Sequence, residues 1–128
     1  MKISHLDHLV LTVADIGITC QFYQSALNFE VITFGENRKA LQFGHQKINL
    51  HQVGKEFEPK ALRPTAGSAD LCFIAETALE DVIAHLHTLN IEIDEGPIER
   101  TGATGKILSI YLRDPDQNLI EISNYLNT

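Results

Sequence analysis

The sequence predicts an α+β fold in which two tandem β-α-β-β-β modules form a curved mixed sheet. Two observations support this prediction. The order of strand-like and helix-like segments starts again near residue 69, and most of the strand-like segments alternate apolar with polar residues. With 128 residues and 44% hydrophobic content, the chain suits a single domain. We place the first module at about residues 4–53, a linker at 54–68 and the second module at 69–127.

The first module begins with a strand at residues 6–13, followed by a helix. Asp15 has the side chain of a helix N-cap, and apolar residues then recur at helical spacing as far as Leu27. Turn residues separate three further short runs rich in strand-forming residues, at 30–35, 39–44 and 47–53. This half of the chain therefore reads as β-α-β-β-β.

The second module repeats that order from residue 70. A strand at residues 70–75 precedes Thr77-x-x-Glu80, which predicts a capping box at the start of a helix that ends near Asn90. Three strands follow, at residues 91–96, 106–113 and 118–125. Three glycines in residues 94–106 predict a loop able to close over a substrate.

Composition and charge exclude several classes of function. The net charge is −7 and the ten Lys and Arg residues are scattered, which argues against nucleic acid as a partner. No apolar run approaches the length of a membrane span, so we expect a cytoplasmic protein that does not enter a membrane. Cys20 and Cys72 are too few for a disulfide framework, and we expect both to be reduced.

Polar residues occupy one face of the first and last strand of each module. Alternation places His8, His51, Asp70 and Glu121 on these faces, opposite apolar neighbours such as Leu9. A helix-backed sheet whose other face meets water explains any single strand equally well. The repeat favours the alternative, in which the four side chains converge about a pseudo-twofold axis.

Several motifs resemble those of the vicinal oxygen chelate superfamily, which holds glyoxalase I, extradiol dioxygenases, fosfomycin-resistance enzymes and bleomycin-binding proteins. They are HLVLTVAD at residues 8–15, FY at 22–23, DPD at 114–116 and LIEI at 119–122. The chain looks most similar to the small glyoxalase-domain proteins described as virulence-associated or dioxygenase-related. It departs from the family at Gln117, where glycine usually follows DPD, and Asn118 is an alternative left-handed residue for that turn.

The resemblance implies a site for a divalent metal, either Zn, Ni, Mn, Fe or Co. Its ligands would be His8, His51 and Glu121, together with Asp70, which ligates directly, ligates through water or orients a neighbour. Asp70 departs from the histidine of extradiol dioxygenases and from the ligand order of glyoxalase I. The family chemistry implies that the ion chelates vicinal oxygens while Glu121 moves protons.

The resemblance also implies a small oxygenated substrate and a homodimer, with sites formed either within one chain or across two. Tyr111 and Ser109 share a strand face on which they would bind a ligand, while Arg100 and Lys106 would bind an anionic one. We expect a metal-dependent lyase, isomerase or dioxygenase. The alternatives are a bleomycin-type protein that sequesters a small molecule without catalysis, and a decayed enzyme that serves as a regulator.

Overall fold

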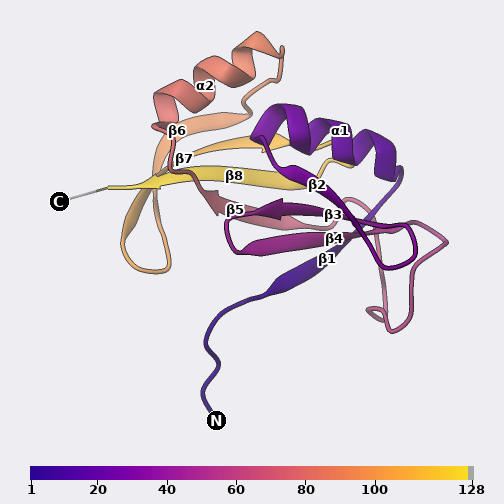
Figure 1. Ribbon diagram of the computed structural model, residues 1–128. Helices are drawn as coiled ribbons and strands as arrows, with labels where there is room; N and C mark the ends of the chain where they lie inside the picture. Colours follow the sequence, from indigo (N-terminus) through magenta and orange to yellow (C-terminus); the bar gives the residue numbers. More distant parts are fainter. Residues whose placement is uncertain (127–128) are drawn as a thin grey trace. The chain divides into compact units, whose positions relative to one another are not determined.

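The chain folds into two compact units, residues 1–68 and residues 69–128, in a computed structural model that describes residues 1–126 (Figure 1). Each unit contains one helix and four strands in the same order. Unit 1 contains β1 (His8–Val13), α1 (Ile16–Leu27), β2 (Glu30–Phe34), β3 (Arg38–Phe43) and β4 (Gln46–Gln52). Unit 2 contains β5 (Asp70–Ile74), α2 (Leu79–Thr88), β6 (Glu95–Thr101), β7 (Lys106–Arg113) and β8 (Leu119–Tyr125). The predicted tandem repeat is therefore confirmed.

Each unit has a four-stranded mixed sheet with the same topology. The strand order is β1-β4-β3-β2 in unit 1 and β5-β8-β7-β6 in unit 2. The first and last strands of each unit pair in parallel, and the other neighbours pair antiparallel. The helix that follows the first strand provides the crossover that a parallel pair requires. The two mixed sheets and two helices confirm the predicted α+β class.

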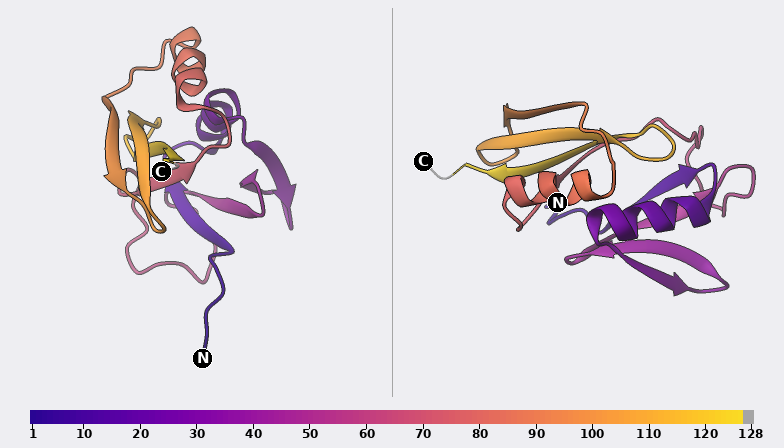
Figure 2. Two further views of the ribbon diagram at one scale, coloured as in Figure 1. Left: turned by 90° about the vertical axis from the view of Figure 1, so that its left-hand side faces the viewer. Right: turned by 90° about the horizontal axis from the view of Figure 1, so that it is seen from above.

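Helix α1 covers one face of the sheet of unit 1 (Figure 2). The apolar residues that alternate along the strands are buried on this side, including Leu11, Leu41 and Leu50. Tyr23 of the helix is fully buried and stacks on Phe29, with 5.7 Å between the ring centroids. Burying these apolar groups leaves the opposite face of the sheet for polar side chains.

The core of unit 2 is built in the same way. Ile110 and Leu112 of β7, together with Ile120 and Ile122 of β8, have their side chains buried, and Leu86 of α2 is fully buried as well. Their polar neighbours along the same strands consequently lie on the other face of the sheet. The residues of the candidate site lie on this polar face.

The two helices begin in different ways. Asp15 caps α1 as predicted, because its Oδ1 accepts a hydrogen bond from the backbone N–H of Ile18 at 3.0 Å. The capping box predicted at Thr77 is wrong, since the N-cap of α2 is Ala78 and no side chain of its own caps the helix. Asn124 of β8 accepts instead from the backbone N–H of Leu79 at 2.7 Å. The helix start is therefore satisfied from a distant strand.

The loop predicted at residues 94–106 is wrong over most of its length. Residues 95–101 form β6, which pairs with β7, and only residues 102–105 form the turn between the two strands. The strand predicted at residues 91–96 is displaced for the same reason, because β6 starts at Glu95. A register irregularity between Glu95 and Ile98 interrupts the alternation from which strands are predicted.

The turn before β8 is ordered by two buried polar residues. Asp114 Oδ2 accepts from Asn118 Nδ2 at 2.8 Å, and Asn118 Oδ1 accepts from the backbone N–H of Ala69 at 2.8 Å. Gln117, rather than Asn118, adopts the left-handed conformation, with φ of 69°. Asn118 is not among the residues with positive φ, and its side-chain amide joins the turn to Ala69, the residue before β5.

Among residues 1–126, no helix is both long enough and apolar enough to cross a membrane.

Candidate functional site

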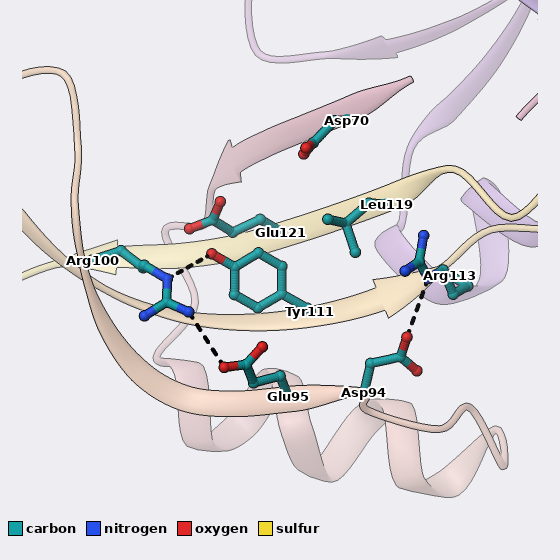
Figure 3. Close-up of a pocket in the computed structure, with 8 residues that line it drawn as sticks. All are labelled: Asp70, Asp94, Glu95, Arg100, Tyr111, Arg113, Leu119 and Glu121. Carbon is teal, nitrogen blue, oxygen red and sulfur yellow. Dashed lines mark hydrogen bonds and ion pairs between the residues drawn. The ribbon is translucent and has the colours of Figure 1, made fainter. Parts of the chain in front are cut away.

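A pocket of about 430 Å³ lies on the polar face of the sheet of unit 2 (Figure 3). Clefts of this size accommodate small-molecule ligands. The side chains that line it come from β5 to β8 and from the residue before β6: Asp70, Asp94, Glu95, Arg100, Tyr111, Arg113, Leu119 and Glu121. Most of them are titratable, so the pocket has the composition of a chemical site more than that of an apolar binding slot.

Glu121 is held in place by two buried serine hydroxyls. Ser109 Oγ donates to Glu121 Oε2 at 2.6 Å, and Ser123 Oγ lies 3.5 Å from the same oxygen. The two hydroxyls also lie 2.6 Å apart, and neither serine side chain is exposed. One carboxylate oxygen is thus committed to the protein in a defined orientation, and the other can bind an ion or a proton.

Arg100 and Tyr111 form a second polar group in the pocket. Arg100 Nε donates to the Tyr111 hydroxyl oxygen at 3.1 Å, and its Nη2 donates to Glu95 Oε1 at 3.3 Å (Figure 3). The hydrogen bond to Tyr111 raises the pKa of Arg100, since it stabilises the guanidinium. Because the tyrosine oxygen accepts this bond, its own hydrogen is directed elsewhere and can be donated to a ligand oxygen.

Arg113 and Asp94 form an ion pair at the other end of the pocket, with 3.1 Å between Nε and Oδ2. The guanidinium also donates to the backbone carbonyl of Gln117 at 3.2 Å, which ties it to the turn before β8. The pocket as a whole has four carboxylates and two guanidinium groups among its lining residues. This excess of negative charge favours a cation or a neutral polar ligand over an anion.

Asp70 lines the same pocket as Glu121. It is the first residue of β5 and is exposed. In the parallel ladder Asp70 lies opposite Leu119, so Glu121 is two residues farther along on the same face. The two carboxylates predicted as ligands in this half of the chain, Asp70 and Glu121, therefore line the same pocket.

His8 stands at the start of β1 with its tautomer defined by a neighbour. The Nδ1 atom of His8 lies 2.8 Å from Asp7 Oδ2, and the hydrogen bond lowers the pKa of the Asp7 carboxyl. A neutral imidazole that donates from Nδ1 presents an unprotonated Nε2, which is the form that binds a metal. The His8 side chain as a whole is 43% exposed.

His51 does not occupy the position in unit 1 that Glu121 occupies in unit 2, and the predicted equivalence is wrong. Glu121 lies two residues beyond the partner of Asp70, whereas the residue two beyond Lys47, the partner of His8, is Asn49. His51 lies opposite Thr12, so it is four residues, or about 13 Å, along the strand from the level of His8. The polar face carries candidates at every second residue of β4, and alternation alone does not distinguish between them.

The four residues predicted to bind substrate have different outcomes. Tyr111 and Arg100 line the pocket, while Ser109 is buried beneath it and orients Glu121. Lys106 is absent from the lining, because it alternates with Ile107 onto the other face of β7 and its Nζ lies 3.5 Å from Thr101 Oγ1.

Four lining residues were not among the predicted site residues, namely Asp94, Glu95, Arg113 and Leu119. Arg113 shares the strand face of Tyr111, so the period of two in β7 was a usable signal. No such signal marks Glu95, because the irregularity in β6 brings it opposite Tyr111.

Within residues 1–126, neither unit by itself gathers three or more His, Cys, Asp or Glu side chains around a point that could hold a metal ion. The candidate ligands are His8 in unit 1 and the Asp70–Glu121 pair in unit 2.

Comparison with known proteins relates nearly the whole chain to one family. Residues 5–122 match the Glyoxalase/Bleomycin resistance protein/Dioxygenase superfamily. Virulence protein STM3117 of Salmonella typhimurium is 63% identical over 126 residues, which cover 98% of this chain and 88% of that protein. Its crystal structure superposes with a TM-score of 0.97, covering 98% of this chain and 100% of the other.

Two further matches extend the comparison. The glyoxalase domain-containing protein RDO1 of Mycosarcoma maydis is 56% identical over 125 residues, covering 98% of this chain and 70% of that protein. The fosfomycin resistance protein FosX of Listeria monocytogenes, crystallised with Mn(II) and sulfate, is 23% identical with a TM-score of 0.67. That match covers 98% of this chain and 93% of FosX, and at this identity it shows a shared fold.

Proposed function

Because the chain belongs to the Glyoxalase/Bleomycin resistance protein/Dioxygenase superfamily, we propose that it is a divalent-metal-dependent enzyme of glyoxalase or dioxygenase type. Its substrate in this proposal is a small oxygenated molecule that chelates the metal. The observation that carries the proposal is Glu121, a carboxylate that lines a pocket and is oriented by the buried hydroxyl of Ser109 at 2.6 Å. A strand position that only faced water would need no buried donor.

The donor atoms fit a divalent ion. His8 has its Nδ1 engaged by Asp7, which prepares Nε2 as a ligand, and Glu121 has one carboxylate oxygen fixed and one available. Asp70 adds a second carboxylate beside Glu121, either as a direct ligand or through water. Imidazole and carboxylate donors suit Zn, Ni, Mn, Fe or Co. A bound ion of this kind supplies Lewis acidity to a chelating oxygen of the substrate.

His51 is left out of the proposed ligand set. Its Nε2 lies 3.4 Å from Arg38 Nη2, so that nitrogen accepts a hydrogen bond from a guanidinium. In the β1–β4 ladder His51 also pairs with Thr12, whereas His8 pairs with Lys47. The position equivalent to Glu121 in unit 1 is held by Asn49, whose amide oxygen is a weaker ligand than a carboxylate.

The other pocket residues bind and orient the substrate. The available oxygen of Glu121 serves one role at a time: it either helps to hold the ion or accepts a proton from the substrate, and in the second case His8 and Asp70 would hold the ion. Tyr111 donates its hydroxyl hydrogen to a substrate oxygen, because Arg100 already occupies the tyrosine oxygen as a donor. Arg113 is held by Asp94 and Gln117, so it limits the length of the substrate at that end.

Steady-state assays of Glu121→Gln and Tyr111→Phe test the proposal. The metal-loaded protein is assayed with three kinds of substrate, which are hemithioacetals of glyoxals, catechols and thiols. We expect Glu121→Gln to reduce kcat at least a hundredfold and Tyr111→Phe about tenfold. Glu99→Gln changes an exposed carboxylate of β6 outside the pocket lining and should leave any activity unchanged.

A second candidate function is favoured by the charge of the pocket. Four carboxylates facing two guanidinium groups also suit a protein that sequesters a cationic small molecule of the bleomycin type, without metal or turnover. Such a binder would hold its ligand equally well in the presence of a chelator. It would also tolerate His8→Ala, whereas the proposed enzyme would not.

We also propose that the protein forms a homodimer in the cytoplasm, as the family commonly does. Cys20 and Cys72 are both free thiols, which accords with a reducing compartment. Sedimentation equilibrium of the purified protein measures the dimer directly, and a monomer at micromolar concentration would refute it. Cell fractionation with a C-terminally tagged chain tests the location.

A further inference from the structure

Hydrogen bonds link Glu121 to an exposed thiol through two buried serines. Ser109 Oγ lies 2.6 Å from Glu121 Oε2 and also 2.6 Å from Ser123 Oγ. Ser123 Oγ in turn lies 3.5 Å from Cys72 Sγ. Both serines are fully buried, whereas Cys72 of β5 is exposed. We call these four residues the Glu121 network, and its outer end is a thiol to which the proposed function gives no role.

The strand ladders of unit 2 hold the Glu121 network on one face of the sheet. Cys72 lies directly opposite Glu121 in the parallel β5–β8 ladder, and Ser109 lies opposite Ser123 in the antiparallel β7–β8 ladder. Glu121 and Ser123 are two residues apart on β8, so their side chains point to the same side. Strand β8 lies between β5 and β7. The positions of the donors therefore depend on the sheet and not on a loop.

Each hydroxyl or thiol has a single hydrogen, and this fixes the direction of every bond in the network. Ser109 donates its hydrogen to Glu121, because an ionised carboxylate can only accept. Ser109 then has no hydrogen left for Ser123, so Ser123 is the donor between the two hydroxyls. For the same reason Cys72 is the donor to Ser123. The bonds thus run in one direction, from the exposed thiol to the carboxylate in the pocket.

The two serines have a second possible arrangement, which Cys72 disfavours. In it Ser109 donates to Ser123, and Ser123 donates to Glu121 Oε2 across 3.5 Å instead of the 2.6 Å from Ser109. A hydroxyl that accepts one hydrogen bond becomes a stronger donor and a weaker second acceptor, because neighbouring hydrogen bonds polarise one another. Ser123 therefore donates to Ser109 more readily when Cys72 donates to Ser123. The thiol in this way favours the short bond to the carboxylate.

The surroundings of Cys72 keep the thiol protonated. Partial burial raises the pKa of Cys72, the hydrogen bond with Ser123 lowers it, and the negative charge of Glu121 raises it. Together these effects raise the pKa of the thiol above its ordinary value. The sulfur therefore carries its hydrogen at neutral pH and is able to donate it.

We propose that Cys72 is a positioning residue for Glu121. Its thiol donates to Ser123, which commits the hydrogen of Ser109 to Glu121 Oε2 and leaves the other carboxylate oxygen for an ion or a proton. The directed bonds do not require metal, so they are tested apart from the proposed function, on which only the catalytic consequence rests.

Infrared spectroscopy of the S–H stretch tests the Glu121 network in metal-free protein. Cys20→Ala leaves Cys72 as the sole thiol and serves as the reference. Adding Ser123→Ala removes the acceptor and should shift the band to higher frequency, because a thiol that donates more weakly has a stiffer S–H bond. Adding Ser109→Ala instead should give a smaller shift in the same direction, since Ser109 lies one bond farther along the network.

Ser68→Ala, at an exposed serine, is the matched control and should leave the S–H band unchanged. A band that stays in place in the Ser123 variant would show that Cys72 does not donate to Ser123. A band that moves in the Ser123 variant but not in the Ser109 variant would show that the thiol does not act through the serine pair. Either result overturns the proposal.

Steady-state kinetics test the catalytic consequence. Cys72→Ala should lower kcat about threefold and leave KM unchanged, because one weak hydrogen bond that orients Glu121 is lost. Cys72→Ser keeps a donor and should restore kcat, which a role in packing alone does not predict. Cys20→Ala changes the other free thiol and should match wild type.

Unchanged kcat in Cys72→Ala, or equal losses in the alanine and serine variants of Cys72, would overturn the positioning role. A wild-type protein without activity would instead refute the proposed function. In that case the infrared shifts alone decide whether Cys72 positions Glu121.

Discussion

Ser109 Oγ donates a hydrogen bond of 2.6 Å to Glu121 Oε2, from a serine that is fully buried one strand away. The relationship explains why a carboxylate can stand mid-strand among Leu119, Ile120 and Ile122. The apolar isoleucines point into the core, while the glutamate lies on the other face above two serine hydroxyls. The buried Ser109 thus sets the orientation of the Glu121 carboxylate in the pocket.

Replacing Ser109 should weaken metal binding without unfolding the protein. Ser109→Ala removes the donor that orients Glu121, and losing a partner of a metal ligand typically lowers metal affinity about tenfold or more. Isothermal titration with Zn²⁺ or Mn²⁺ measures the change. Ser68→Ala, at an exposed serine outside the pocket lining, is the control. Equal affinity for the Ser109 variant and wild type would show that the hydrogen bond has no part in metal binding.

The stability of the metal-free protein should fall as the pH drops below about 6.5, in part because of His51. Burial lowers the pKa of His51 from its ordinary value of 6.5, and the adjacent Arg38 lowers it further. The unfolded chain therefore takes up a proton before the folded chain does, so stability present above pH 6.5 is lost at lower pH.

His51→Gln tests this titration by removing it. In EDTA-containing buffer, the Tm of the variant should fall less between pH 7.5 and pH 5.5 than the Tm of wild type. His45→Gln, at an exposed histidine of the same unit, should follow the wild-type curve. Parallel curves for wild type and His51→Gln would contradict the assignment.

Glycine should stabilise the turn before β8. Gln117 is exposed and has φ of 69°, a left-handed conformation that a side chain disfavours. The hydrogen bonds of this residue in the turn come from its backbone, so Gln117→Gly keeps them. We expect the free energy of unfolding to rise by about 1 kcal/mol. Urea denaturation measures it, and Gln117→Ala, which retains the strain, should show no such gain.

Alanine at Gly96 should disrupt the wall of the pocket. Its φ is 108°, and an added Cβ would lie 2.4 Å from the Ser109 backbone oxygen. Gly96→Ala therefore has to separate β6 from β7 where Glu95 meets Tyr111, at a cost of about 2–3 kcal/mol. Gly44→Ala also has positive φ, 52°, but meets no atom within 4 Å, so it should cost less. Chemical denaturation compares the two, and similar losses would exclude the steric explanation.

Most helices and strands could be predicted from the sequence, because the residue patterns that indicate them lie within the segments themselves. Residues 106–113 form β7 as expected, and Asp15 caps α1 through its own side chain. The errors involve contacts between distant residues. Asn124 caps α2 from 45 positions away, and β6 starts with the irregular segment at Gly96, which has no periodicity to detect.

The candidate site was predictable to a similar extent. Alternation placed Glu121 and Tyr111 on one face, and the structure shows both in the pocket. Alternation does not determine the register between strands, so it did not separate Asn49 from His51 on β4. The ladder makes that distinction, because it shows which residues of β1 and β4 lie opposite one another.

Metal content per chain tests the central proposal most directly. The protein is purified without a histidine tag, dialysed against mixed divalent ions and measured by plasma mass spectrometry, beside His8→Ala, Glu121→Ala and the exposed control Glu99→Ala. We predict close to one ion per chain in wild type and in the control, and its loss in His8→Ala and in Glu121→Ala. Metal absent from wild type, or retained by both variants, would contradict the proposed metalloenzyme.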